Sequence, residues 1–196
     1  MSPIGSIESI YELLASVVPS KGPNAYGALA SSGADQQACV RMVVLRGLKI
    51  EENLLWINTN ARSAKVTHLR QNPVAEVALW LPRRKIQLRL RATWRVVDAA
   101  LAGRSQNLAA LRQQAWTEQP AMARRLYNWP DPDLPIDADD EPENPRSAKA
   151  RTPPRSFAVL LGSMDHVDAL RLTKPVHERF IFDRARQVWQ TQRVTP

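Results

Sequence analysis

The sequence predicts an all-β core of six or more strands with peripheral helices. The clearest signal is Lys85 to Val97, where apolar and polar residues alternate strictly over more than the roughly 5–6 residues of an average strand. Other strand-like runs follow one another through short links, which favours antiparallel pairing. Because the sequence has neither a GxGxxG motif after a strand nor a P-loop, a Rossmann-type nucleotide site is not expected.

A helix opens the chain, and strand-like runs follow it. Apolar residues recur at helical spacing from Ile7 to Val18, and Ser6 precedes them as a suitable N-cap. The next runs are short, apolar and partly β-branched, which predicts strands over residues 39–45, 54–58 and 74–81. The run over 74–81 is nearly continuous, and we expect it to be buried on both faces of its sheet.

Further helices are predicted between and after these strands. Residues 61–71 have helical character, Asn60 can cap them, and Asn72-Pro73 ends them. A second helical region runs from about 103 to 128 and is broken at Gln119-Pro120.

A proline-rich and acidic segment then interrupts the pattern. Residues 129–155 contain seven prolines, and residues 131–143 contain seven acids and no base. Such a composition cannot bury a core, so we expect a loop insertion at about 129–155 within a single domain that spans 1–196. Strands are predicted again over residues 156–162, 167–172, 177–183 and 188–194, the last two as a hairpin.

The charge balance indicates an anionic partner. The chain has 196 residues and a formal net charge of +8, and its body is more basic still because the acids cluster in one segment. Such a surface attracts a phosphorylated cofactor, a nucleotide or nucleic acid, and charge alone does not choose among them. No apolar stretch is long enough to span a bilayer, no secretory signal is recognisable, and there is one cysteine, Cys39, so a cytoplasmic setting is expected.

Several residues with binding chemistry stand at predicted strand ends or helix starts. They are the run Arg41-Met42-Val43-Val44-Leu45-Arg46, the pair Asn58-Thr59, the residues Ser63 and Lys65, Gln87 within the alternating strand, and Arg179 in the hairpin. Arg41 can bind two oxygens of a phosphate dianion, Lys65 adds a point charge and Ser63 a hydroxyl. A helix that starts near residue 61 adds free backbone N–H groups. Taken singly, Ser63 and Lys65 are explained equally well as a helix-start residue and a solvated charge.

In their order and spacing these residues resemble the motifs of the pyridoxamine 5′-phosphate oxidase family of FMN-binding split barrels. The similarity runs from Arg41 to Gln87 and resumes with Arg179, Trp189 and the terminal residues 193–196. The segment from Leu111 to Pro130 resembles the subgroup called the Alr4036-type FMN-binding domain. The resemblance implies a six-stranded antiparallel split β-barrel with peripheral helices, FMN as cofactor, and a homodimer with FMN at its interface.

The resemblance also implies roles for individual residues. Asn58 and Thr59 match a strand end that bonds the flavin ring or ribityl chain, and Gln87 matches a glutamine that reaches the flavin. Arg46 would stabilise negative charge on reduced flavin. Arg179 matches an arginine supplied by the partner subunit; a surface charge on an exposed strand is its alternative. The implied cofactor site consists of Arg41, Met42, Val43, Val44, Arg46, Asn58, Thr59, Ser63, Lys65, Gln87 and Arg179.

The implied function is an FMN-dependent oxidoreductase whose substrate differs from pyridoxamine 5′-phosphate. Ala64 and Pro175 fall where the vitamin-phosphate enzymes carry basic residues for phosphate. No residue is identified as catalytic, and the three scattered histidines predict no metal site. The alternatives are a flavin-binding carrier with little turnover, a deazaflavin or haem protein of the same fold, and a basic nucleic-acid-binding protein that uses the arginines between 83 and 95.

Overall fold

The computed structural model describes residues 4–18, 25–132, 134–135 and 151–196. The strands are β1 (Ala25–Ser32), β2 (Ala38–Lys49), β3 (Leu54–Asn60), β4 (Val74–Leu81), β5 (Ile86–Val97), β6 (Phe157–Arg171), β7 (Glu178–Ala185) and β8 (Val188–Val194). The helices are α1 (Ile7–Val17), α2 (Ala64–Gln71), α3 (Ala99–Ala102), α4 (Gln106–Thr117), α5 (Ala121–Arg125) and the short 3-10 helix η1 (Leu126–Asn128).

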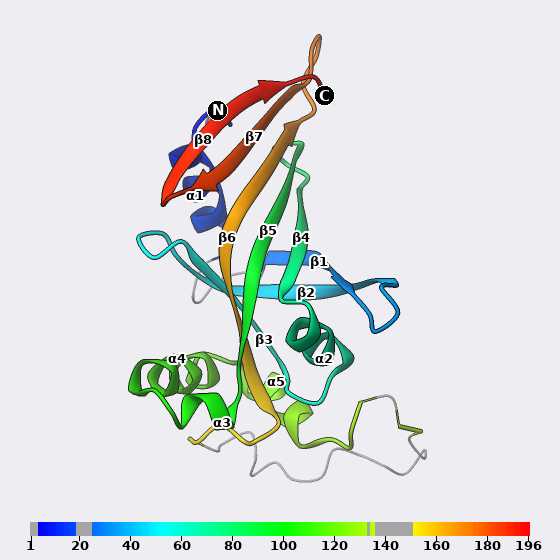
Figure 1. The fold of residues 1–196 in the computed structure, drawn as a ribbon, viewed down its shortest axis with the longest axis vertical. Helices are drawn as coiled ribbons and strands as arrows, with labels where there is room; N and C mark the ends of the chain where they lie inside the picture. The colour runs from blue at the N-terminus through cyan, green and yellow to red at the C-terminus, as the bar shows by residue number, and fades with distance from the viewer. Residues whose placement is uncertain (1–3, 19–24, 133, 136–150) are drawn as a thin grey trace.

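Six strands close into an antiparallel barrel in the order β3-β2-β1-β4-β5-β6, and the pairing of β3 with β6 completes the ring (Figure 1). This confirms the mainly β prediction. The alternation in β5 works as expected, because Ile86, Leu88 and Leu90 are buried in the barrel core while the polar residues between them face outward. β4 is not buried on both faces, so that prediction is wrong. Its outward side chains Val74 and Trp80 are 44% and 49% exposed, since the barrel covers only the inner face.

β6 is one strand of 15 residues, although two shorter strands were predicted. Its pairing with β5 shifts in register between Arg91 and Ala92, which marks a bulge. β6 continues through this bulge as a single strand. The first half of β6 pairs with β3, and the second half pairs with β7. The predicted hairpin, β7–β8, is confirmed and extends the sheet beyond the barrel (Figure 1).

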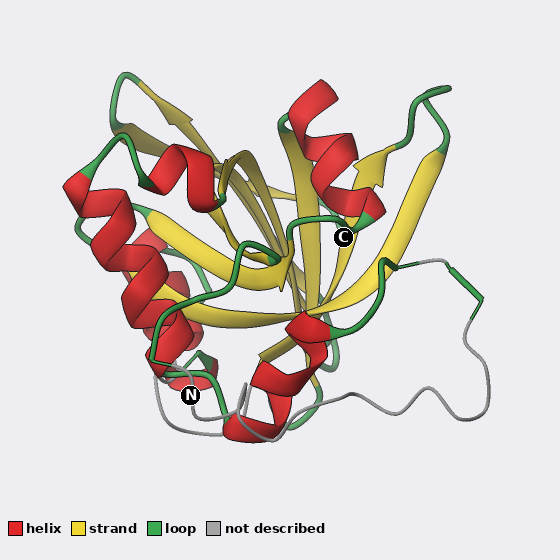
Figure 2. Cartoon of the chain, turned by 90° about the horizontal axis from the view of Figure 1, so that it is seen from below, coloured by secondary structure: helices red, strands yellow, loops and turns green. Residues whose placement is uncertain are grey.

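Helices lie around the sheet (Figure 2), and two apolar cores hold them against it. α1 begins after Ser6, whose side chain accepts a hydrogen bond from the Ser9 N–H as the predicted cap, and it buries Ile10 and Leu13 in the barrel core. α4 and η1 pack outside the barrel, where the ring of Trp116 meets Phe157 edge-on at 5.1 Å between centroids. β1 was not predicted; its small residues give a weak strand pattern.

α2 begins three residues later than predicted. Its N-cap is Ser63, not Asn60. The Asn60 side chain instead accepts a hydrogen bond from the Arg62 N–H at 2.9 Å and shapes the turn that precedes the helix.

Most of the predicted insertion at 129–155 lies outside the described residues, and the single domain over 1–196 stays a prediction. Among the described helices, none has the length and apolar character needed to cross a bilayer.

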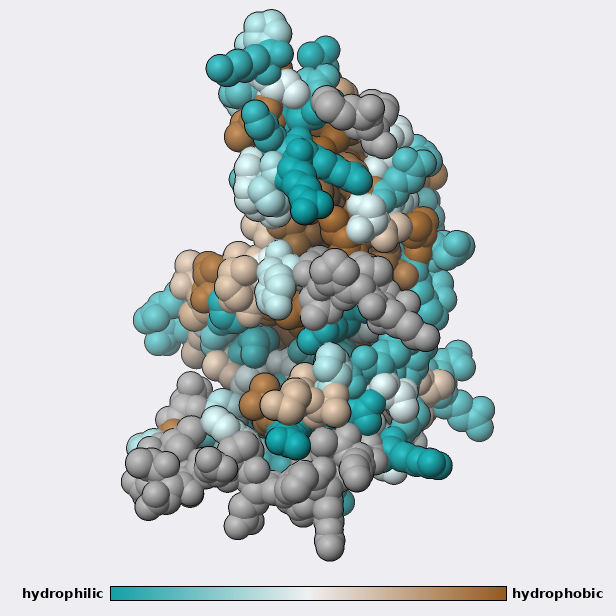
Figure 3. Space-filling model, turned by 180° about the vertical axis from the view of Figure 1, so that it is seen from behind, coloured by the Kyte–Doolittle hydropathy of each residue, from teal (hydrophilic) through white to brown (hydrophobic). Residues whose placement is uncertain are grey.

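The outer faces of β1, β2 and β4 carry exposed apolar side chains. Tyr26 is 63% exposed, Val40 and Met42 are each 65% exposed, and Trp80 is 49% exposed. The register keeps them on one surface, because β1 pairs with β2 on one side and β4 on the other. Seen from behind, apolar residues gather at mid-height, where β1 and β2 cross the molecule (Figure 3). We name Tyr26, Val40, Met42 and Trp80 the apolar face.

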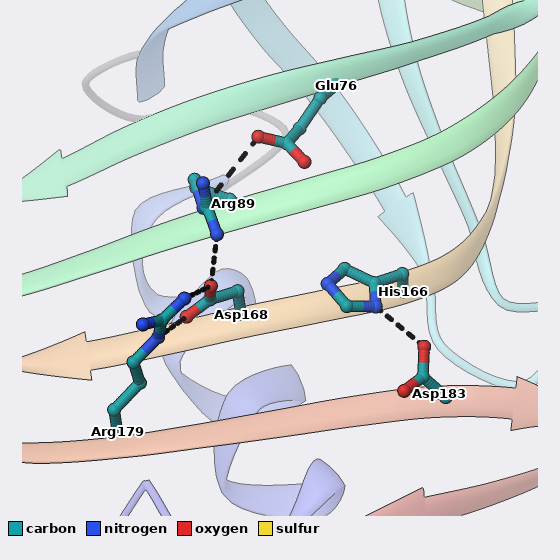
Figure 4. Close-up of polar contacts among 6 residues, drawn as sticks. All are labelled: Glu76, Arg89, His166, Asp168, Arg179 and Asp183. Carbon is teal, nitrogen blue, oxygen red and sulfur yellow. Dashed lines mark hydrogen bonds and ion pairs between the residues drawn. The ribbon is translucent and has the colours of Figure 1, made fainter. Parts of the chain in front are cut away.

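Asp168 connects the hairpin to the barrel. Its side chain is only 3% exposed; Arg179 of β7 donates to it at 2.8 and 3.1 Å, and Arg89 of β5 donates a further hydrogen bond (Figure 4). Burial by itself raises the pKa of the Asp168 carboxyl. The hydrogen bonds and positive charges of Arg179 and Arg89 outweigh that effect, so its pKa lies below the ordinary value.

Replacing Asp168 by asparagine should lower the free energy of unfolding by roughly 1–3 kcal/mol, because hydrogen bonds to charged groups contribute about that much. Denaturant titration at neutral pH measures the change. Asp165→Asn is the matched control, since Asp165 lies on the same strand in a more exposed pair with Arg91, and surface pairs contribute about 0–1 kcal/mol. Equal losses in the two variants would contradict a special role for Asp168.

The stability difference between wild type and Asp168→Asn should depend on pH. A carboxyl with a lowered folded-state pKa contributes its full stability above the ordinary pKa, here 3.8, and loses that contribution as the pH falls through the folded-state value. The stability gap between wild type and Asp168→Asn should therefore narrow as the pH drops below 3.8.

Candidate cofactor site

Three predicted site residues meet where β3 runs into α2. The Lys65 ammonium donates to the hydroxyl of Thr59 at 3.2 Å and to that of Ser63 at 3.1 Å, and the two hydroxyls lie 3.3 Å apart. Thr59 and Ser63 are buried. One cation is thus held beside two hydroxyl groups at the start of a helix, which are the groups that bind a phosphate. We call Thr59, Ser63 and Lys65 the hydroxyl–ammonium cluster.

Arg41 approaches the same helix from β2. Its Nη1 donates to the Ser31 hydroxyl at 2.6 Å and to two backbone carbonyls of the β1–β2 hairpin. Ser31 in turn contacts the His68 Nδ1 at 3.2 Å, and His68 lies about one turn along α2 from Lys65. Within the described part of the chain, Nε and Nη2 of Arg41 have no hydrogen-bond partner, so these donors could serve an anion.

The β2 strand presents its residues alternately. Val43 is buried in the barrel, whereas Met42 and Val44 point outward. The pairing shifts between Leu45 and Gly47, which leaves Arg46 as the extra residue of a bulge. Bulges of this kind redirect a side chain. Burial raises the pKa of the Tyr127 hydroxyl to about 12, and the positive charge of Arg46 opposes this rise. Arg46 therefore lies close enough to η1 for its charge to act there.

Gly47 is required by this arrangement. A Cβ at this position would lie 1.8 Å from the nearest indole atom of Trp56 on β3. The indole therefore fills the space beside the bulge and fixes the strand on which Arg46 stands.

Asn58 has an unfilled buried acceptor. Its Nδ2 donates to the Ala115 carbonyl of α4 at 3.2 Å, but its Oδ1 is buried and has no hydrogen-bond partner among the described residues. Buried polar atoms are normally paired, so this oxygen indicates a missing donor. An N–H or hydroxyl of a bound ligand would supply one.

Gln87 and Arg179 lie elsewhere. Gln87 pairs with Leu170 on β6, and Leu170 pairs with Arg179 on β7. Asn58 pairs with Val159 on the same strand, and at about 3.3 Å per residue the distance from 159 to 170 along β6 is roughly 35 Å. Within one chain, Arg179 is therefore separated from the hydroxyl–ammonium cluster, and its guanidinium is bound to Asp168. Gln87 also pairs with Trp80 of β4, so the register places it beside the apolar face.

Sequence analysis missed Ser31, His68 and Tyr127. Ser31 belongs to the unpredicted strand β1. The spacing of His68 from the other histidines and the isolated Tyr127 gave no pattern that indicates a binding site. Arg62, which precedes α2, donates to the Trp129 carbonyl at 2.8 Å, and both residues line a cavity of about 450 Å³.

The residues present fit an FMN molecule. The hydroxyl–ammonium cluster and Arg41 supply donors for a phosphate, and the outward residues of β2 lead from there to Arg46. The orphaned Asn58 Oδ1 can accept a hydrogen bond from the flavin ring or ribityl chain.

Comparison with known proteins finds similarity to FMN-binding proteins. Residues 12–98 match the family described as pyridoxamine 5′-phosphate oxidase, FMN-binding domain. A pyridoxine/pyridoxamine 5′-phosphate oxidase 2 from Arabidopsis thaliana is 25% identical over 178 residues and covers 88% of each chain.

Two crystal structures share the fold. A pyridoxamine 5′-phosphate oxidase-related, FMN-binding protein from Nostoc punctiforme is 27% identical over 96% of each chain, with a TM-score of 0.79. PhzG from Burkholderia lata, 16% identical, covers 100% of this chain and 94% of its own with a TM-score of 0.74, and shows the fold alone. The family match thus covers most of α1 and the strands β1 to β5, and the likeness to the Nostoc protein extends over nearly the whole chain.

Proposed function

We propose that this protein binds FMN and acts as an FMN-dependent oxidoreductase. The observation that carries the proposal is the hydroxyl–ammonium cluster, which lies where β3 runs into α2. The strand β3 also bears the orphaned Asn58 acceptor. Lys65, Ser63 and Arg41 would hold the phosphate, and Asn58 the ring or ribityl chain. Bound FMN would supply hydride transfer at its ring. Arg46, permanently protonated, would favour negative charge on the ring but cannot move a proton.

The flavin phosphate should account for much of the affinity. Lys65→Met removes one charge-assisted contact, which corresponds to about tenfold to a hundredfold weaker FMN binding. Fluorescence titration with FMN and with riboflavin measures it, and the variant should bind riboflavin nearly as wild type does. Arg70→Met is the matched control: it removes a cation from the far end of α2, where Arg70 pairs with Asp98. Equal affinity of wild type for FMN and riboflavin would contradict the phosphate assignment.

The substrate is proposed to differ from pyridoxamine 5′-phosphate. Pro175 occupies the position of a basic residue that binds substrate phosphate in the vitamin-phosphate enzymes, and proline offers no donor there.

FMN-loaded protein should therefore consume no oxygen above background when pyridoxamine 5′-phosphate is added. The free flavin in buffer is the control, and an oxygen electrode is the measurement. Oxygen consumption that continues over many turnovers of pyridoxamine 5′-phosphate would show that the substrate site is retained despite Pro175.

We also propose a homodimer that shares its FMN sites. Exposed apolar side chains rarely gather on the surface of a monomer, and the apolar face includes Met42, a neighbour of the proposed flavin residues on β2. A second copy of this chain is its proposed occupant. Because Arg179 lies roughly 35 Å along β6 from the β3 end of the site, it would reach the flavin of the partner, whereas Gln87 would serve the flavin held by Arg41 and Lys65 of its own chain.

Two weakened variants should complement each other if the sites are shared. Lys65→Met and Arg179→Gln each damage one side of the site, and a heterodimer formed by refolding them together contains one intact site. The mixture should regain tight FMN binding that neither parent shows, while sedimentation confirms the dimer. A mixture that binds no better than its parents would reject sharing.

The narrower assignment to the Alr4036-type subgroup is part of the same proposal. It rests on the segment from Leu111 to Pro130, in which Arg112 is buried against the Phe157 carbonyl and Trp116 lies in the second core.

A further inference from the structure

A basic cleft opens at the end of the sheet opposite the α2 site. It has a volume of about 900 Å³ and lies between the β4–β5 turn and the connection that follows β6. Both segments lie near each other toward the hairpin end of the molecule (Figure 1). Its polar lining includes Arg83, Arg84, Lys85, Arg171, Lys174 and His177. We call this the basic cleft.

The positive charges of the basic cleft are largely uncompensated. Among the residues that the structure describes, no aspartate or glutamate lines it, although the Arg171 guanidinium has Glu178 at 3.3 Å. The other lining arginines and lysines, all of them exposed, form no ion pair with any residue that the structure describes. Like charges gathered in one cleft repel one another and raise the local concentration of anions. A bound anion would relieve that repulsion.

The walls of the cleft are braced by their own backbone. The Leu172 N–H donates to the Lys85 carbonyl at 2.9 Å, which joins the two walls. Within the connection, the Thr173 hydroxyl donates to the Val176 carbonyl, and the His177 Nδ1 lies 3.0 Å from the Thr173 carbonyl. A cleft held in this way loses less conformational freedom when it binds a ligand.

The floor of the cleft is apolar. Leu13 of α1 and Ile86 of β5 are almost fully buried beneath it, and Leu172 is 37% exposed at its wall. Its volume falls in the range of about 300–1,000 Å³ that is typical of small-molecule pockets. The ligand that suits such a lining has an apolar body and a strongly negative end.

The basic cleft is distinct from the proposed flavin site. Ile86 and Arg171 pair with each other and face α1 and the barrel core. Gln87 and Leu170, one residue along each strand, point to the opposite face of the sheet because side chains alternate.

We propose that the basic cleft binds a small organic phosphate, with the apolar body over Leu13 and Ile86 and the phosphate among Arg83, Arg84 and Lys174. The small volume and apolar floor of the cleft favour such a molecule over a nucleic-acid backbone, which needs an extended basic track.

Calorimetric titration of FMN-saturated protein with 1-naphthyl phosphate tests the proposal. Binding should be measurable, and the double variant Arg84→Gln/Lys174→Gln should weaken it tenfold or more, because two charge-assisted contacts are lost. The neutral analogue 1-naphthol should bind much more weakly than the phosphate. Arg104→Gln, which removes an exposed cation between α3 and α4, is the control and should leave binding unchanged.

Three results would overturn the proposal. One is equal binding of 1-naphthyl phosphate by wild type and double variant, and another is equal binding of the phosphate and 1-naphthol. The third is tighter binding of a short oligonucleotide that the double variant abolishes, which would assign the cleft to nucleic acid. Thermal unfolding checks the fold of each variant, and Arg83→Gln, at the exposed tip of the turn, replaces the double variant if that one fails to fold.

Discussion

The pairing of β3 with the first half of β6 determines how every other part of this protein is arranged. It closes the barrel, and it leaves the second half of β6 free to carry β7 and β8 beyond the ring. One strand of 15 residues therefore belongs to both the barrel and the extension. Because that strand is long, the two ends of the molecule can hold different binding groups that do not touch within one chain.

Both ends of the molecule carry positively charged side chains, but the partners of these side chains differ. At the α2 end, Lys65 is bonded to hydroxyls and Arg41 keeps two donor atoms that no described residue uses, an arrangement suited to an anion. At the hairpin end, Arg179 is already bound to the buried Asp168 carboxylate, so its first contribution is to the fold. In the basic cleft beside it, Arg83, Arg84, Lys85 and Lys174 form no ion pair with any residue that the structure describes. The same residue type thus serves stability in one place and binding in another, depending on whether an acid is buried next to it.

Local pattern predicted the elements whose environment is simple. β5 alternates because one face is barrel core and the other is solvent, and Ser6 caps α1 because its side chain reaches the Ser9 N–H. The prediction failed where contacts distant in sequence decide the outcome. β4 was expected to be buried on both faces, yet Trp80 is half exposed, and a continuous apolar run does not reveal whether anything covers its outer side. The N-cap of α2 is Ser63 and not Asn60, because the Asn60 side chain instead accepts a hydrogen bond within the preceding turn.

The sequence by itself determined the mainly β class, the order of the motifs and the chemistry of Arg41, Ser63 and Lys65, because these depend on residue type and on spacing along the chain. Only the tertiary structure decided which of these groups meet. It joined Lys65 to Thr59, linked Arg41 to α2 through Ser31, and separated Arg179 from all of them. The physical reason is that strand register and barrel closure fix distances between residues far apart in sequence, and neither is encoded in any local pattern.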